Sequence, residues 1–115
     1  MTIQIVSSPI SKKELGNIAQ EQFGDFVKAV VDVERGVMAL GGDLHADGEA
    51  ILIENGSRQQ NLWGINLWPV KSESEWIEFN SMINVRPSQG NRSRSVESQT
   101  EREKILKIVN GLVAE

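Results

Sequence analysis

The chain has 115 residues, close to the commonest size of one compact domain, so we expect a single domain over residues 1–115. Apolar residues make up 39% of the chain and charged residues 24%, a composition that excludes an intrinsically disordered protein. Twelve basic residues against sixteen acidic ones leave a formal charge of −4, which disfavours general binding to nucleic acid or to an anionic membrane.

The cysteine content and the apolar runs indicate where the protein works. The sequence has no cysteine, which excludes disulfide scaffolds, thiolate metal sites and cysteine nucleophiles. Residues 1–6 lack the basic start and the long apolar stretch of an export signal. No apolar run approaches the roughly 18 residues that are needed to span a bilayer. We therefore expect a soluble, cytoplasmic protein with no membrane segment.

Residues 1–24 predict a strand followed by a helix. The isoleucines and the valine within residues 3–6 favour a short strand, because β-branched side chains suit a pleated surface. Ser11 stands three residues before Glu14, which is the spacing of a capping box at the start of a helix. We expect this helix to begin after Ser11 and to end at Gly24.

Residues 26–40 predict a β-hairpin. Apolar and polar residues alternate over residues 26–33, with the period of a half-buried strand. Residues 34–36 then form a three-residue loop that ends in glycine, which adopts the positive φ that such a loop requires. Residues 37–40 return as the second strand of the hairpin.

Residues 43–56 are open to two interpretations. Asp47 stands where it would cap a helix through residues 50–53, and Asn55 with Gly56 would close that helix. The same Ile-Leu-Ile run also fits a strand between two turns, because a short apolar run does not distinguish the two structures. We favour the helix.

The second half of the chain predicts two strands and a final helix. Residues 62–68 and 76–85 have the composition of strands. In the second of these, alternation would place a polar row on one face: Glu78, Asn80, Met82, Asn84 and Arg86. Ser98 and Glu101 repeat the capping-box spacing, and apolar residues then recur at helical intervals. The elements together predict an α+β fold, with an antiparallel or mixed sheet of about five strands built from two hairpins and about three helices packed mainly on one face.

The loop over residues 86–94 is the leading candidate for a binding site. It holds three arginines and several amide or hydroxyl donors in a chain that is otherwise acidic, and it leads into the start of the last helix. Guanidinium groups and the free N–H groups of a helix N-terminus both favour anions. We expect Arg86, Asn91, Arg92 and Arg94 to bind an anionic group, carried by a small ligand or by a protein partner. One alternative is a solvated loop whose polar residues only keep the protein soluble, and another is that nearby glutamates neutralise the arginines.

A second hypothesis makes the protein an enzyme. His45 is the only histidine, and Glu78 lies on the polar row of the predicted strand. A metal-independent ribonuclease or phosphodiesterase needs a base, an acid and cations to stabilise the charge on the phosphoryl group. In this hypothesis Glu78 is the base, His45 is the acid, and Arg86 with Arg92 holds the phosphate.

A third hypothesis is a divalent-metal site between Asp43 and Glu54. The spacing of the acidic residues nearly matches a calcium-binding EF-hand loop, but His45 replaces one of its oxygen ligands. The residues on both sides also lack the two helices of an EF-hand. We therefore expect no metal and no cofactor, and we read this segment as an acidic helix start.

Several segments of the chain are similar to one known family. They are FGD at residues 23–25, VKAVVDV at 27–33, GGDLHAD at 41–47, LWGIN at 62–66, SMINVRP at 81–87 and NRSR at 91–94. On these segments the chain resembles a family of small microbial proteins that is catalogued as a domain of unknown function. The resemblance implies a self-contained cytoplasmic domain, and it carries over no activity, cofactor or catalytic residue. A homodimer is the default expectation for a small domain with exposed strand edges.

Overall fold

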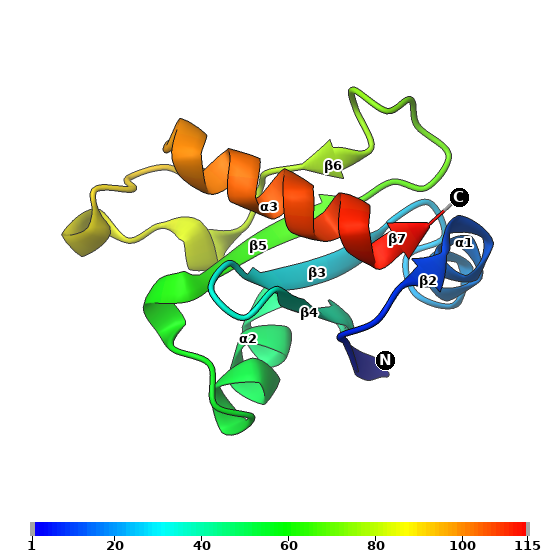
Figure 1. Ribbon diagram of the computed structural model, residues 1–115, viewed down its shortest axis with the longest axis horizontal. Coiled ribbons are helices and arrows are strands. Elements are labelled where there is room, and N and C mark those ends of the chain that lie inside the picture. Colours follow the sequence, from blue (N-terminus) through cyan, green and yellow to red (C-terminus); the bar gives the residue numbers. More distant parts are fainter. Residues whose placement is uncertain (1, 115) are drawn as a thin grey trace.

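A five-stranded antiparallel sheet forms the centre of the structure, a computed structural model that describes residues 2–114 (Figure 1). Its strands lie in the order β1-β4-β3-β5-β6. Their bounds are β1 Ile3–Val6, β3 Val27–Asp32, β4 Val37–Gly41, β5 Leu62–Leu67 and β6 Ile77–Glu78. The predicted α+β fold and the predicted hairpin of β3 and β4 are confirmed. A second sheet is a short parallel pair, β2 (Ile10–Ser11) with β7 (Val113–Ala114).

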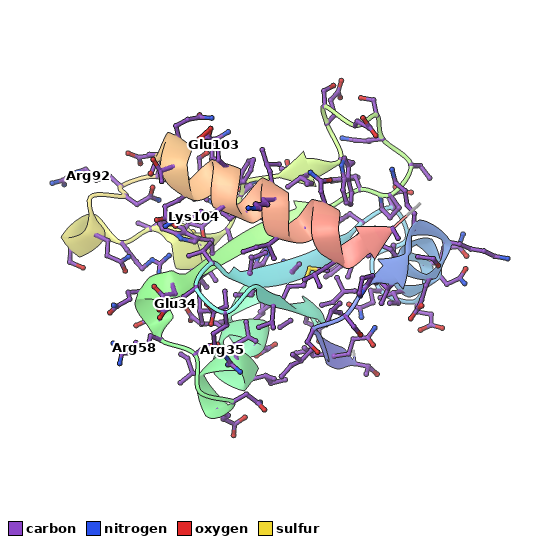
Figure 2. The ribbon with its side chains drawn as sticks, viewed as in Figure 1. Glu34, Arg35, Arg58, Arg92, Glu103 and Lys104 are labelled. Carbon is purple, nitrogen blue, oxygen red and sulfur yellow. The ribbon has the colours of Figure 1, made fainter. Side chains whose placement is uncertain are left out.

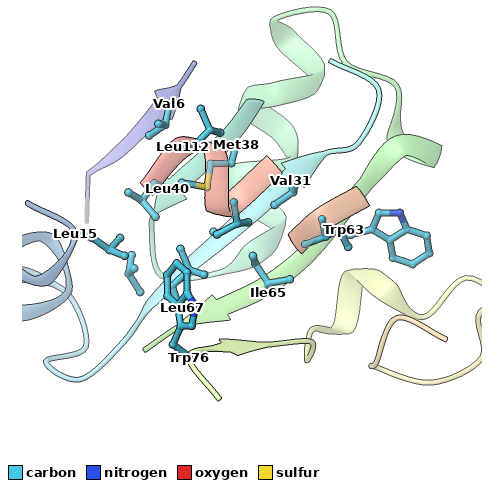
Figure 3. Close-up of a cluster of buried hydrophobic side chains, with 14 of the residues drawn as sticks. Val6, Leu15, Val31, Met38, Leu40, Trp63, Ile65, Leu67, Trp76 and Leu112 are labelled. Atoms are coloured by element: carbon cyan, nitrogen blue, oxygen red, sulfur yellow. The ribbon is translucent and has the colours of Figure 1, made fainter. Parts of the chain in front are cut away.

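Helices cover both faces of the sheet. Helices α1 (Lys12–Glu21) and α3 (Gln99–Leu112) share one large core with the sheet, and part of this core is drawn in Figure 3. Helix α2 (His45–Glu54) covers the opposite face, where Leu52 packs with Val30, Ala39 and Leu62. The expected packing mainly on one face therefore holds for α1 and α3, and α2 is the exception.

Both predicted capping boxes begin helices. The hydroxyl oxygen Oγ of Ser11 accepts a hydrogen bond from the backbone N–H of Glu14 at 3.0 Å. Helix α1 begins at Lys12, directly after Ser11. Oγ of Ser98 accepts one from the N–H of Glu101 at 3.2 Å at the start of α3. Each bond satisfies one of the N–H groups that a helix leaves unpaired at its start.

The ambiguous segment 43–56 is a helix, but Asp47 does not cap it. Helix α2 begins at His45, after Leu44, which makes no side-chain capping hydrogen bond. The helix lies close to the sheet at Gly48, where an added Cβ would stand 3.1 Å from Cγ2 of Val30. Contact with the sheet fixes the start of α2 and places His45 in its first turn, facing the sheet.

The strand predicted over residues 76–85 is wrong beyond Glu78. The chain leaves the sheet after β6 and turns through two 3₁₀ helices, η2 (Met82–Asn84) and η3 (Pro87–Gln89). The side chain of Asn84 takes over the pairing with β5. Its Oδ1 accepts from the N–H of Gly64 at 2.8 Å, and its Nδ2 donates to the carbonyl of Gly64 at 2.9 Å. A side chain thus supplies the two hydrogen bonds that a longer β6 would have made.

Candidate functional site

A cavity of about 320 Å³ lies beside His45, where the start of α2 meets β3, β5 and the segment that follows β6. Its polar and charged lining is Lys28, His45, Asn66, Asn80, Ser81 and Arg94. Its apolar lining is Phe26, Leu44, Ala46, Met82 and Ile83. None of these residues is an aspartate or a glutamate. We call this space the His45 cavity.

His45 lines this cavity with only 8% of its surface exposed. Its Nε2 lies 2.8 Å from the backbone carbonyl of Ile65, and a carbonyl only accepts, so Nε2 carries the proton and donates. The ring fits because residue 64 is glycine: an added Cβ there would stand 3.1 Å from Cδ2 of His45. The sequence and the backbone of β5 thus fix the orientation of the imidazole.

The electrostatic environment favours the neutral imidazole. Burial lowers the pKa of His45, and the charges of Lys28 and Arg94 lower it further, while Ile65 and Asn66 act in the opposite direction. A neutral ring that carries its proton on Nε2 has an unprotonated Nδ1. At neutral pH the ring therefore offers one donor, which is already used, and one free acceptor.

Asn66 lines the His45 cavity and is hydrogen-bonded to Glu78. Its Nδ2 donates to Oε1 of Glu78 at 3.0 Å and to the carbonyl of Asn80 at 3.3 Å. Oε1 of Glu78 also accepts from Nε1 of Trp68 at 3.1 Å. His45 and Asn66 line the cavity, whereas Glu78 contacts Asn66 but does not line the cavity itself.

The Oδ1 atom of Asn66 is buried and has no hydrogen-bond partner among residues 2–114. Asn66 itself is 8% exposed and lines the His45 cavity. The amide cannot turn over to pair this oxygen without breaking both bonds of Nδ2. An unpaired buried acceptor costs about 1–3 kcal/mol, so its persistence next to a cavity calls for an explanation.

Of the four residues predicted to bind an anion, Arg94 lines the His45 cavity. Its backbone carbonyl accepts from the N–H of Ser81 and from Nδ2 of Asn84, both at 3.0 Å. These bonds hold the arginine at the rim while its side chain is exposed. Lys28, on β3, supplies the second cation, and its Nζ lies 5.3 Å from the ring centre of Phe23.

Arg86 is engaged in holding the fold together. Its Nη1 donates to the carbonyl of Gln59 and its Nη2 to the carbonyl of Leu62. The guanidinium also stacks on Trp63, with Cζ 4.1 Å from the ring centre. Burial lowers the pKa of Arg86, and the charges of Glu49 and Glu101 oppose that effect. This guanidinium has little capacity left for an external anion.

Asn91 and Arg92, which were also expected to bind an anion, do not line the His45 cavity. Asn91 is 3% exposed; its Nδ2 donates to the carbonyls of Asn84 and Ser95, each at 2.7 Å.

The side chain of Arg92 is exposed and points outward at the end of the molecule (Figure 2). Its backbone N–H donates to Oε2 of Glu97 at 2.9 Å. The N–H of Ser93 donates to the same oxygen. The side chain of Ser93, followed by the backbone N–H groups of Ser93 and Arg92, lowers the pKa of Glu97. A carboxylate of the chain itself thus occupies the backbone donors of this loop.

A second, larger cavity of about 690 Å³ lies at the other end of the sheet, beside the start of α3. Its charged lining is Glu34, Glu97, Glu101 and Lys104, of which Figure 2 labels Glu34 and Lys104. Lys104 is paired with Glu101 at 3.7 Å. This acidic lining is unfavourable for an anion, in contrast to the His45 cavity.

The metal hypothesis finds no support in the geometry. Within residues 2–114, no group of three or more His, Cys, Asp or Glu side chains lies close enough together to hold an ion. Over the same residues, no helix is long and apolar enough to cross a membrane.

Comparison with known sequences identifies the family of the chain. The family model described as "Protein of unknown function (DUF5674)" matches residues 4–112, which is nearly the whole chain. The chain belongs to the DUF5674 family. No curated protein and no solved structure matches it. The resemblance to a domain of unknown function is thus confirmed. The function of this DUF5674 protein has to be inferred from the geometry of its site.

Lys28 and Asn66 are the site residues that sequence reasoning missed. In the sequence, Lys28 is only a polar position within the alternating segment 26–33. Asn66 lies inside the apolar run of β5. Asn66 did leave a signal, because it is a polar side chain in a strand whose residues are all buried. A buried polar residue in such a strand needs partners, and it therefore points to a polar site.

Proposed function

We propose that this DUF5674 protein binds a small organic anion in the His45 cavity. The observation that carries the proposal is the charge of the lining. In a chain with a formal charge of −4, residues 2–114 give the cavity two cationic side chains and no carboxylate. Such a local reversal of charge attracts an anion against the overall field of the protein.

The start of α2 adds to the attraction. Residues 44–46 line the cavity, and the free N–H groups in the first turn of a helix favour a negative charge. The guanidinium of Arg94 offers two parallel donors to a carboxylate or a phosphate group. Lys28 supplies a charge from the sheet. Of the anion-binding set predicted from the sequence, the proposal keeps Arg94 and adds Lys28.

The apolar lining indicates the rest of the ligand. Leu44 is 58% exposed and Met82 is 65% exposed, and both border the cavity together with Phe26 and Ile83. A bare phosphate ion would leave these side chains in water, whereas an aliphatic or aromatic group would cover them. The volume of about 320 Å³ is at the lower end of the range for small-molecule sites. The fitting ligand is a small carboxylate or phosphate ester with an apolar body.

The geometry supports binding better than catalysis. A general acid must hold a proton that it can release, but the Nε2 proton of His45 is donated to Ile65 and the ring is held neutral. Oε1 of Glu78 already accepts two hydrogen bonds. The catalytic roles of His45 and Glu78 remain predictions.

Calorimetric titration with benzoate, hexanoate, phenyl phosphate and inorganic phosphate tests the proposal. We expect binding of the anions with an apolar body, weaker binding of inorganic phosphate, and a loss of about tenfold or more in affinity in Arg94→Ala. Arg92→Ala is the matched control, because it removes the same charge from the same loop outside the cavity. Equal losses in the two variants, or no binding of any probe, would contradict the proposal. A preference for phenyl phosphate over benzoate would identify phosphate esters as the ligand class.

A further inference from the structure

The His45 cavity contains a mismatch between two neighbouring polar groups. Oδ1 of Asn66 is a buried acceptor without a partner among residues 2–114. The imidazole beside it is neutral, so its free Nδ1 is an acceptor too. Two acceptors cannot form a hydrogen bond with each other. One added proton would convert Nδ1 into a donor.

Elimination identifies the two polar atoms of these side chains that no other residue engages. The Asn66 side chain lines the same cavity as the imidazole and favours its charged form. Nε2 of His45 donates to the carbonyl of Ile65, and Nδ2 of Asn66 donates to Glu78 and to the carbonyl of Asn80. The remaining pair is Nδ1 of His45 and Oδ1 of Asn66.

We propose that the cavity takes up its organic anion together with one proton from the solvent. The proton binds Nδ1 of His45, and the new N–H donates a hydrogen bond to Oδ1 of Asn66. This inference rests on the proposed function, because it concerns the same ligand and the same cavity. It makes the affinity of the protein for its ligand dependent on pH.

The charges around the ring explain why the proton arrives with the anion. Lys28 on β3 and Arg94 on the loop after η3 both act against an imidazolium ion. Glu78 on β6 lies behind Asn66, and Glu49, one turn further along α2, acts on Arg86. A bound carboxylate would offset the charges of Lys28 and Arg94 and add a negative charge near the ring. The imidazolium then becomes favourable, and both of its N–H groups have a buried acceptor.

The titration of the only histidine in the chain measures this coupling directly. The Cε1–H signal of His45 in the NMR spectrum needs no assignment, since the sequence has one histidine. Benzoate is the probe, because its carboxyl group does not titrate between about pH 5.5 and 8. We expect the pKa of His45 to be higher in the benzoate complex than in the free protein by about one unit or more.

Calorimetry supplies the second readout. Benzoate titrations near pH 7 in buffers of different ionisation enthalpy report the number of protons taken up on binding. We expect net proton uptake, and an affinity that rises as the pH falls, by up to about tenfold per pH unit. His45→Gln keeps an amide N–H for the carbonyl of Ile65 but cannot titrate, so its benzoate affinity should not vary with pH.

The outcomes separate this inference from the proposed function. Benzoate binding without proton uptake, with the same pKa of His45 in the free and bound protein, would contradict the inference and leave the anion site intact. Absence of binding for every probe anion would remove both. The NMR titration uses the unaltered protein, so the test does not depend on the folding of a variant.

Discussion

The side chain of Asn84 pairs with the backbone of Gly64 through two hydrogen bonds, 2.8 and 2.9 Å long, and so continues the sheet beyond the end of β6. Nδ2 of Asn84 also donates to the carbonyl of Arg94, and Nδ2 of Asn91 donates to the carbonyl of Asn84. One buried asparagine therefore joins β5 to the loop that carries Arg94. The position of Arg94 at the His45 cavity depends on this connection.

Replacement of Asn84 tests this connection. Asn84→Ala leaves the buried N–H and C=O of Gly64 without partners, and each unsatisfied group costs about 1–3 kcal/mol. We expect the free energy of unfolding, measured by urea denaturation, to fall by at least about 2 kcal/mol. The exposed Asn55 serves as the control, because water can replace its bond to the carbonyl of Ile51. If Asn84→Ala and Asn55→Ala lowered the free energy of unfolding by similar amounts, the pairing of Asn84 with Gly64 would not contribute to the stability of the fold.

Gly64→Ala is expected to destabilise the protein and to displace His45. The added Cβ would stand 2.6 Å from Cβ of Ser81 and 3.1 Å from Cδ2 of His45, which is closer than packed atoms tolerate. Overpacking of this kind costs about 1–3 kcal/mol. Gly16→Ala is a matched control within α1, where an added Cβ meets nothing within 4 Å. That variant should gain about 0.5–1 kcal/mol in the same thermal or urea denaturation. Equal stability of the two variants would contradict the close packing of β5 against His45.

Arg86→Lys is expected to destabilise the fold, although it keeps the charge. A lysine cannot place two donors on the carbonyls of Gln59 and Leu62 while it covers Trp63. Loss of these contacts should lower the free energy of unfolding by about 1–3 kcal/mol. Arg92→Lys, at an exposed position on the same loop, should change it by less than about 0.5 kcal/mol. If Arg86→Lys were as mild as Arg92→Lys, the structural assignment of Arg86 would be wrong.

The stability of the protein without a ligand should depend on pH through His45. Its pKa is lowered in the folded state, chiefly by burial, so the unfolded chain binds a proton more readily. The stabilisation is complete above the ordinary histidine pKa of about 6.5 and is lost as the pH falls through the lower pKa of the folded state. Urea denaturation at a series of pH values should show this decline in the wild type and a flatter profile in His45→Gln. Identical profiles would show that His45 does not titrate differently in the folded and unfolded states.

Local signals predicted most of the fold. The capping serines and the hairpin of β3 and β4 depend on neighbours within a few residues, and these predictions were confirmed. The hairpin loop spans residues 33–36 rather than 34–36, and β3 is buried rather than half-buried. The start of α2 was missed because Gly48 packs against Val30, a contact that is distant in sequence. The extent of β6 was missed because an asparagine side chain pairs with the strand in place of a backbone.

The site was harder to predict because charge alone does not show which arginines are free. Arg86 and Arg94 have the same side chain on the same loop, yet one is bound to two carbonyls of the fold and the other lines a cavity. Lys28 reaches that cavity only through the register of β3 with β5, which sets Lys28 opposite Asn66. Pairing between strands, rather than composition, brings the cations of the site together.

Amide shift mapping with benzoate tests the central proposal most directly. In ¹H–¹⁵N spectra recorded during a benzoate titration, we expect the largest changes at the amides of Ala46, Asn66, Asn80 and Arg94, which surround the His45 cavity. The amides of Glu97, Ser98 and Glu101, which line the larger acidic cavity, should change little. Changes centred on that acidic cavity, or no changes at millimolar benzoate, would contradict an anion site beside His45.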